Sequence, residues 1–149
     1  MKKIAIGCDH GGFKLKESLK GYLSGKGYAV EDFGSYNEDA SDYPLIGYEV
    51  ARAVSRRRHK RAILICKTGI GMAIIANKLS NVRSGVCNTV GQAKTSRLHN
   101  DTNVLSLAAK YINDQTAKRI VGAWLAAKAL PGRHRRRVGQ IGKLERRRG

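Results

Sequence analysis

The sequence has little proline, few aromatic residues and few acidic residues. It contains 2 Pro, 6% aromatic residues, and 11 Asp and Glu against 29 Lys and Arg. Apolar residues make up an ordinary 42%, and no apolar run approaches the roughly 20 residues of a membrane span. This composition excludes collagen-like, mucin-like and coiled-coil chains. The 17 Gly instead indicate a globular fold with many tight turns between strands and helices.

The length of 149 residues predicts one domain, spanning residues 1–149, that can bury a sizeable core without a staple. No linker or internal repeat divides the chain. The apolar run that follows Lys2 and Lys3 is too short for the core of a signal peptide. We therefore expect a cytoplasmic protein that does not associate with membranes.

Cysteine is also scarce. Cys8, Cys66 and Cys87 show neither CxxC nor Cys/His ligand spacing, so reduced thiols and no metal site are expected. Cys8 and Cys87 are interpreted as small buried residues. Cys66 has a functional alternative, described below.

The positive charge is confined to the later part of the chain. Residues 1–50 hold 6 Lys and Arg against 8 Asp and Glu, whereas residues 51–149 hold 23 against 3. Such a field attracts polyanions and phosphorylated small molecules alike, and charge alone does not choose between them. The basic runs at 56–61 and 146–148 are interpreted as a solvated loop and a solvated tail. Neither is interleaved with aromatic residues, as a nucleic-acid stacking platform requires.

Short apolar runs rich in β-branched residues alternate with helical patterns. The predicted strands are 3–8, 28–33, 62–66, 84–87 and 104–107. The predicted helices are 13–25, 44–55, 72–79, 90–98 and 115–130. This alternation predicts an α/β, three-layer Rossmann-like fold with a five-stranded parallel sheet and helices on both faces. Residues 133–148 predict an extra C-terminal amphipathic helix.

Two segments directly after predicted strands carry chemically useful side chains, and ligands of open α/β sheets bind at this edge. The first is Cys8-Asp9-His10-Gly11-Gly12. The second is Cys66-Lys67-Thr68-Gly69-Ile70-Gly71, a turn whose backbone N–H groups can receive an oxyanion or phosphate. Its spacing matches neither a P-loop nor a dinucleotide fingerprint. A thiol beside a lysine at the head of a helix favours the thiolate, but Cys66 could equally end a buried strand as an apolar residue.

Two later segments also have a functional and a structural interpretation. His99 and Asn100 either act chemically or cap the neighbouring elements. Arg133 and Arg137 are four residues apart, so they share one face of a helix and suit a phosphate. A solvated basic face is the alternative.

Taken together, these segments resemble the type B ribose-5-phosphate isomerases, a family that also contains galactose-6-phosphate isomerase subunits. The matching stretches are GCDHGGFKLK at 7–16, DYP at 42–44, ILIC-x-TGIGM-x-I-x-ANK at 63–78, SRLHNDTNVL at 96–105 and GRH-x-x-RV at 132–138. They follow one another in order along nearly the whole chain.

The resemblance implies a cofactor-free and metal-free interconversion of ribose 5-phosphate and ribulose 5-phosphate through an enediolate. It implies that Cys66 is the base, that His99 opens the sugar ring as an acid, and that Asp9 and Thr68 complete the catalytic set. Phosphate contacts would come from His10, Arg133 and Arg137, and the backbone of 67–71 would receive the enediolate oxygen. The implied substrate-binding residues are Asp9, His10, Tyr43, Lys67, Thr68, Gly69, Ile70, Gly71, Asn100, Lys110, Arg133 and Arg137.

Three residues depart from the pattern expected for this family. Lys67 and Pro131 stand where Gly is usual, and Lys110 stands where Arg is usual. If residue 67 needs a positive φ, Lys67 is strained by roughly 1 kcal/mol, and Lys67→Gly should raise turnover or stability. The alternatives in function are an isomerase of allose 6-phosphate or galactose 6-phosphate, and a non-catalytic basic α/β domain that binds RNA.

The order of the predicted elements separates the implied catalytic residues. Asp9 and Cys66 follow strands, whereas His99 and Arg133 follow helices that return to the opposite edge of the sheet. The length of a strand, about 15–20 Å, would then lie between base and acid within one chain. A two-fold dimer brings the two edges together, so the sequence predicts a homodimer, or a dimer of dimers, in which His99 acts on the partner's site.

Overall fold

The structure is a computed structural model that describes residues 2–148. These residues form one five-stranded sheet in which every strand pair is parallel and the strand order is β2-β1-β3-β5-β4. The strands are β1 (Lys2–Cys8), β2 (Tyr28–Asp32), β3 (Ala62–Cys66), β4 (Ser84–Val86) and β5 (Val104–Ala108). The predicted parallel sheet is confirmed.

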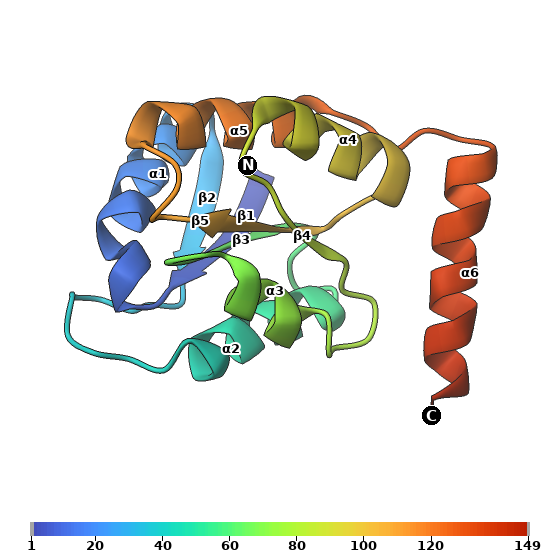
Figure 1. The fold of residues 1–149 in the computed structure, drawn as a ribbon, viewed down its shortest axis with the longest axis horizontal. Coiled ribbons are helices and arrows are strands. Elements are labelled where there is room, and N and C mark those ends of the chain that lie inside the picture. The colour runs from blue at the N-terminus through green and yellow to red at the C-terminus, as the bar shows by residue number, and fades with distance from the viewer. Residues whose placement is uncertain (1, 149) are drawn as a thin grey trace.

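Helices cover both faces of the sheet, which confirms the predicted three layers. Helices α1, α4 and α5 lie on one face, and α2 and α3 lie on the other (Figure 1). The helices are the 3-10 turn η1 (His10–Gly12), α1 (Phe13–Gly25), α2 (Tyr43–Ser55), α3 (Ile70–Ala76), α4 (Val90–Asn100), α5 (Asp114–Ala126) and α6 (Arg133–Arg147). No helix among residues 2–148 is long and apolar enough to cross a membrane.

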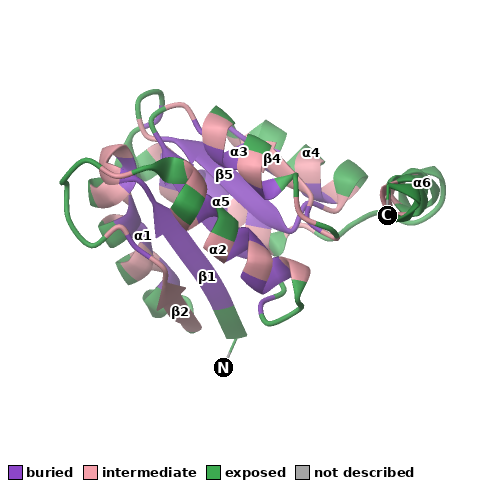
Figure 2. Ribbon diagram, turned by 90° about the horizontal axis from the view of Figure 1, so that it is seen from below, coloured by how far each residue is buried: buried purple, intermediate pink, exposed green. Residues whose placement is uncertain are grey.

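The central strand β3 is buried along its whole length, and Figure 2 shows its neighbours β1 and β5 buried over most of theirs. Because side chains of a strand alternate between faces, Ile63 and Ile65 belong to the core under α1, α4 and α5, and Leu64 to the core under α2 and α3. Trp124 is fully buried in the first core, and its indole N–H donates to Thr102 Oγ1 at 2.9 Å. The two cores pack against the two faces of the sheet and so hold in place the strand ends that carry the candidate site.

Helix α5 ends at Ala126 rather than at residue 130, and tertiary contacts explain the difference. The Arg61 guanidinium donates to the Leu125 carbonyl at 3.0 Å, and the Leu130 N–H donates to the Leu98 carbonyl at 2.9 Å. Ala127 is extended, with φ −76° and ψ 145°. These contacts outweigh the good helix propensity of the sequence that follows.

Helices α3 and α4 also differ from their predicted bounds. Helix α3 ends at Ala76, because the Asn77 side chain bonds both the N–H and the carbonyl of Ser84. Helix α4 continues to Asn100 and stops where Asp101 adopts the left-handed region at φ 46°. His99 therefore lies in the last turn of a helix, not in the connection after it.

The C-terminal helix α6 is present as predicted, and it stands apart from the body of the molecule (Figures 1 and 2). None of its described residues is buried, and its contacts with the rest of the chain are mainly with α4. A helix with a basic face and exposed Ile141 and Leu144 does not contribute to either core.

The basic run before β3 is only partly the solvated loop that was expected. His59 is 4% exposed, and its Nε2 is hydrogen-bonded to Glu31. Arg58 also pairs with Glu31, while Arg61 is half-buried. The run at 56–61 is therefore anchored by the contacts with Glu31 and by the half-buried Arg61, and its remaining side chains face solvent.

Candidate functional site

A pocket opens at the carboxyl ends of β1 and β3, the two adjacent strands from which the chain runs outward in opposite directions. This switch point is where parallel α/β sheets bind their ligands. The pocket has a volume of about 450 Å³. It is lined by Asp9, His10, Tyr43, Cys66, Lys67, Thr68, Ile70, Gly71 and Ile74.

Cys66 lies at the floor of this pocket at the end of β3, and it is 5% exposed. The N–H of Gly69 donates to its Sγ at 3.2 Å. Gly69 adopts the left-handed region at φ 73°, where a side chain would be strained and a Cβ would lie 3.1 Å from the Leu107 backbone. A glycine is thus needed to turn a backbone donor toward the sulfur.

The donors of the turn are divided between internal and outward roles. The Ile70 N–H donates to Thr68 Oγ1 at 3.3 Å, and the Gly69 N–H is occupied by Cys66. The N–H of Gly71 lies in the first turn of α3, where no carbonyl of the helix can accept from it. In the turn at residues 67–71, the Gly69 N–H therefore binds the Cys66 thiol, and the Gly71 N–H at the start of α3 remains available to a ligand oxygen.

Lys67 does not adopt a positive φ. The residues other than glycine that do so among 2–148 are Arg57, Asn81 and Asp101. The strain anticipated for Lys67 is therefore wrong, because the left-handed position of the turn is Gly69. The exposed Lys67 side chain instead lies along Gly11, where an added Cβ would come within 2.9 Å of its Cγ.

Asp9 and His10 are held by the turn that follows β1. Asp9 is 7% exposed, and its Oδ1 accepts from the Gly11 N–H at 3.0 Å. The His10 N–H donates to Ser41 Oγ at 3.0 Å, and the Ser41 N–H donates to His10 Nδ1 at 3.2 Å. The neutral ring consequently carries its proton on Nε2. Sequence reasoning missed Ser41, since a serine in a polar loop gives no signal of a partner 31 residues away.

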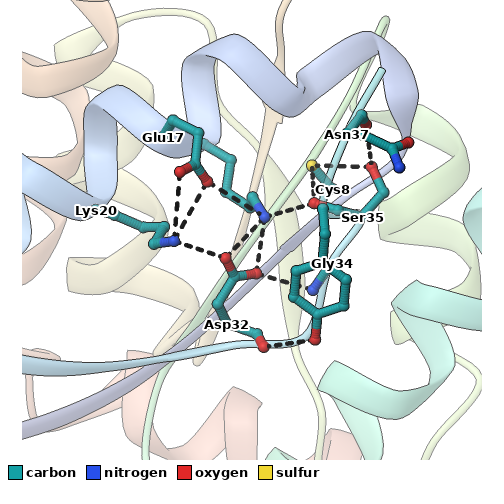
Figure 3. A network of polar contacts seen from close by, with 9 residues as sticks. Cys8, Glu17, Lys20, Asp32, Gly34, Ser35 and Asn37 are labelled. Atoms are coloured by element: carbon teal, nitrogen blue, oxygen red, sulfur yellow. Dashed lines mark hydrogen bonds and ion pairs between the residues drawn. The ribbon is translucent and has the colours of Figure 1, made fainter. Parts of the chain in front are cut away.

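A buried ion-pair network holds the start of the loop between β2 and α2 (Figure 3), and Ser41 lies further along the same loop. Lys16 is fully buried and donates to both carboxylate oxygens of Asp32 at 2.8 Å and to the Ser35 carbonyl at 2.6 Å. Burial opposes ionisation of Asp32, but hydrogen bonds from Lys16, Lys20 and the Gly34 N–H lower the pKa of its carboxyl. The network ties the loop to α1 and to the end of β2.

Tyr43 begins α2 and closes one side of the pocket. Its ring lies so near Gly71 that a Cβ at residue 71 would come within 2.6 Å of the ring atoms. Tyr43 as a whole is 39% exposed. The close approach joins the first turn of α2 to the first turn of α3 at the pocket wall.

His99 belongs to a second group of residues, at the end of α4 and the start of α6. Its ring stacks on that of His134, with centroids 4.1 Å apart and an interplanar angle of 4°. Both line a separate cavity of about 290 Å³. Burial against the neighbouring side chains and the charges of His99, Arg133 and Arg137 lower the pKa of His134.

The remaining predicted site residues do not join the Cys66 pocket within one chain. Arg133 and Arg137 are exposed on α6, and Asn100 lines a third cavity between α6 and β4. Lys110 follows β5, and its N–H donates to the Lys67 carbonyl at 2.9 Å, but its ammonium lies 5.8 Å from the Tyr111 ring centroid. The structure thus separates two groups of site residues, as the order of the elements predicted.

The other two cysteines are buried, as interpreted from the sequence. Burial raises the pKa of the Cys8 and Cys87 thiols. Within residues 2–148, no group of three or more His, Cys, Asp or Glu is arranged to hold a metal ion.

Comparisons with known proteins give consistent matches over almost the whole chain. Residues 4–141 match the family model described as Ribose/Galactose Isomerase. The chain is 45% identical to ribose-5-phosphate isomerase B of Escherichia coli, covering 99% of both chains. It is 39% identical to D-erythrulose-4-phosphate isomerase of Pectobacterium atrosepticum, covering 97% of this chain and 96% of that one. The solved structure of ribose-5-phosphate isomerase B from Mycoplasma genitalium with bound ribulose 5-phosphate superposes with a TM-score of 0.93 at 34% identity, covering 97% and 96% of the two chains.

Proposed function

The chain belongs to the ribose/galactose isomerase family of sugar-phosphate isomerases, and from this premise we propose that it interconverts ribose 5-phosphate and ribulose 5-phosphate. The proposal rests on one observation about the site. A nearly buried thiol receives a backbone hydrogen bond at the floor of a polar pocket, and the pocket lies at the switch point of the sheet.

The chemistry begins with a closed sugar ring. An acid must protonate the ring oxygen so that the C1 aldehyde is exposed, and we assign this step to His99. The Cys66 thiolate then removes the proton from C2, and the electrons of that bond move to the carbonyl oxygen to form the enediolate. Return of the proton to C1 gives the ketose. Asp9, which is held by the Gly11 N–H, moves the proton between the hydroxyl oxygens of C1 and C2.

Charge develops on oxygen in the enediolate, so donors must face it. The first-turn N–H groups of α3 and the hydroxyl of Thr68 are the candidates, and the pocket lining supports this choice. Tyr43 would close over the sugar. His10 Nε2 can donate to the phosphate, because Ser41 fixes the proton on that nitrogen. Binding the remote phosphate would hold C1 and C2 in register with the sulfur.

The acid and the phosphate arginines would come from a second copy of the chain. His99, Arg133 and Arg137 belong to a group that is separated from Cys66 in one chain, and a strand of five residues spans about 15–20 Å. That distance is too great for one pentose phosphate. A two-fold homodimer with the carboxyl edge of one copy against α4 and α6 of the other gives two shared sites.

A coupled assay on purified protein tests the reaction and the substrate together. Ribose 5-phosphate, allose 6-phosphate, galactose 6-phosphate and erythrulose 4-phosphate are compared by kcat/KM, with and without a chelator. We expect the highest value for ribose 5-phosphate and no effect of the chelator. A higher value for a four- or six-carbon substrate would reassign the substrate, and loss of turnover with the chelator would contradict a metal-free mechanism.

A further inference from the structure

A second strongly charged cavity lies at the amino edge of the sheet, the edge opposite the Cys66 pocket. Its volume is about 600 Å³. Lys2 at the start of β1 and Arg61 just before β3 lie on its wall, so the two strands that carry the isomerase pocket at one end carry this cavity at the other. Its basic residues come from three separate stretches of the chain, namely β1, the α2–β3 connection and the segment after α5.

The cations of this cavity are largely uncompensated. Its wall includes Lys2, Lys3, Arg57, Lys60, Arg61 and Lys128. Within residues 2–148, none of these six side chains forms an ion pair with a carboxylate. The nearby acid, Glu31, is already engaged by Arg58 and by His59. Burial, together with the charge of Arg97, lowers the pKa of Arg61.

Part of the cavity wall is held in place by hydrogen bonds and packing. The Arg61 guanidinium donates to the Leu125 carbonyl and lies 5.4 Å from the Trp124 ring centroid. His59 is 4% exposed and fixes the connection to β2 through Glu31. The cavity therefore has a fixed floor, and exposed Lys60 and Arg57 stand at its rim.

We propose that this cavity binds a small ligand with two or more adjacent phosphate groups, at a site distinct from the isomerase pocket. Six unpaired cations around one cavity repel one another, and a compact multivalent anion relieves that repulsion better than a single phosphate. A free polyphosphate and the phosphates of a nucleotide share this chemistry. RNA fits less well, because the phenol ring at the wall, Tyr28, is half-buried and already has the Lys2 ammonium over it, whereas stacking platforms use several open aromatic faces.

The test is calorimetric titration with tripolyphosphate, ADP, ATP and inorganic phosphate at fixed ionic strength, since screening weakens every such contact. The variant Arg57→Gln/Lys60→Gln removes two rim charges that make no hydrogen bond through their side chains among the described residues. Lys78→Gln/Lys94→Gln is the matched control, because it removes the same charge from exposed positions outside the cavity. We expect one tripolyphosphate per chain, at least about tenfold weaker binding in the first variant, and less than about twofold change in the control.

Several results would overturn the proposal. Equal weakening in both variants would mean that net charge alone attracts the anion. Loss of binding in Arg133→Gln/Arg137→Gln would place the polyphosphate in the proposed sugar-phosphate site. Inorganic phosphate binding as tightly as tripolyphosphate would remove the requirement for adjacent phosphates, and an RNA oligonucleotide displacing tripolyphosphate at lower concentration would point to nucleic acid. Two results would support the proposal and distinguish the source of the phosphates. Stronger binding of ATP than of tripolyphosphate would identify a nucleotide as the ligand, and stronger binding of tripolyphosphate than of ATP would identify a free polyphosphate.

The isomerase assay separates this proposal from the proposed function. Arg57 and Lys60 lie outside the Cys66 pocket and outside the His99 group, so their variant should keep turnover of ribose 5-phosphate within about twofold of the unmodified protein. Thermal unfolding of each variant checks that the fold is retained. Polyphosphate binding with no isomerase activity would refute only the proposed function.

Discussion

The two edges of the sheet that carry the site residues are built in different ways. At the carboxyl edge, Cys66, Asp9 and His10 each have a hydrogen-bond partner, and the loop nearby is tied down by a buried ion pair. At the opposite edge, His99 is exposed and stacks on His134 of a helix that buries none of its described residues. One half of the proposed site is complete within the chain, and the other half is displayed outward.

This difference indicates which group of residues is positioned by its own chain and which group is not. Precise positioning of the proposed base, Cys66, requires neighbours that hold its geometry, and residues at the carboxyl edge of the same chain supply them. The His99 group on α4 and α6 makes few contacts that fix it within its own chain, and in the proposed homodimer its order would come from the second copy. The following predictions test this contrast, in order of decreasing effect.

The largest effect should come from the locked edge. Cys66→Ala removes the proposed base and should lower kcat by at least about 10³-fold while leaving the thermal unfolding temperature nearly unchanged. Cys87→Ala is the control, since Cys87 is buried in the core away from the pocket and should keep near-normal turnover. Near-normal turnover in Cys66→Ala would show that the base is another residue.

The displayed edge is tested by combining two inactive proteins. Cys66→Ala and His99→Ala chains, mixed under subunit exchange, should give heterodimers with up to about half of the normal activity, because one of their two shared sites is intact. Activity of isolated heterodimers is measured after tag-based separation, with each homodimer as control. Verified heterodimers without recovered activity would mean that base and acid act within one chain.

The buried ion pair between Lys16 and Asp32 is tested next. Asp32→Asn leaves the fully buried Lys16 with only its longer ion pair to Glu17, at 3.5 Å, which should lower the free energy of unfolding by about 3 kcal/mol. Glu38→Gln, which removes the exposed pair with Lys14, is the control and should cost less than about 1 kcal/mol. Urea denaturation at neutral pH measures both.

The pH dependence of the stability of Asp32→Asn follows from the direction in which the pKa of Asp32 is shifted. The pKa of Asp32 is lowered in the fold, so its contribution is present above the ordinary value of 3.8 and is lost as the pH falls through the folded pKa. The stability difference between Asp32→Asn and the unmodified protein should therefore shrink in acid. A difference that stays constant down to the lowest pH at which both proteins fold would contradict the assignment.

The smallest effect is expected at Lys67. Since Lys67 has no positive φ, replacement by glycine relieves no strain and adds backbone freedom to the unfolded chain. Lys67→Gly should lower the free energy of unfolding by about 0.5–1 kcal/mol and change turnover by no more than about threefold. Lys67→Ala separates loss of the side chain from the effect of glycine. A clear rise in turnover in both variants would show that the lysine obstructs the pocket.

Much of this architecture is predictable from the sequence because its signals are local. The run Ala62–Cys66 is bounded by a basic segment and a glycine turn, and the structure has β3 at those residues. The meeting of Asp9 and Cys66 follows from the rule that parallel strands end at one edge. The separation of His99 from Cys66 follows from the same alternation of strands and helices.

What the sequence did not predict depends on contacts between distant segments. Ser41 holds His10 from 31 residues away, and the end of α5 is set by carbonyls that bond to Arg61 and Leu98. The absence of strain at Lys67 depends on which residue of the turn takes the positive φ, and the alternative at Gly69 becomes visible only in the folded backbone. Such features are set by tertiary packing, which outweighs local propensity.

The contact between Tyr43 and Gly71 has a mechanical consequence. Because the ring leaves room for no more than a hydrogen atom on residue 71, the first turns of α2 and α3 cannot approach further, and separating them would break a close-packed contact. This contact favours movement of the first turns of α2 and α3 as one unit at the wall of the Cys66 pocket. A sugar phosphate would then be admitted by movement of side chains at the rim or, in the proposed homodimer, by displacement of α4 and α6 of the second copy.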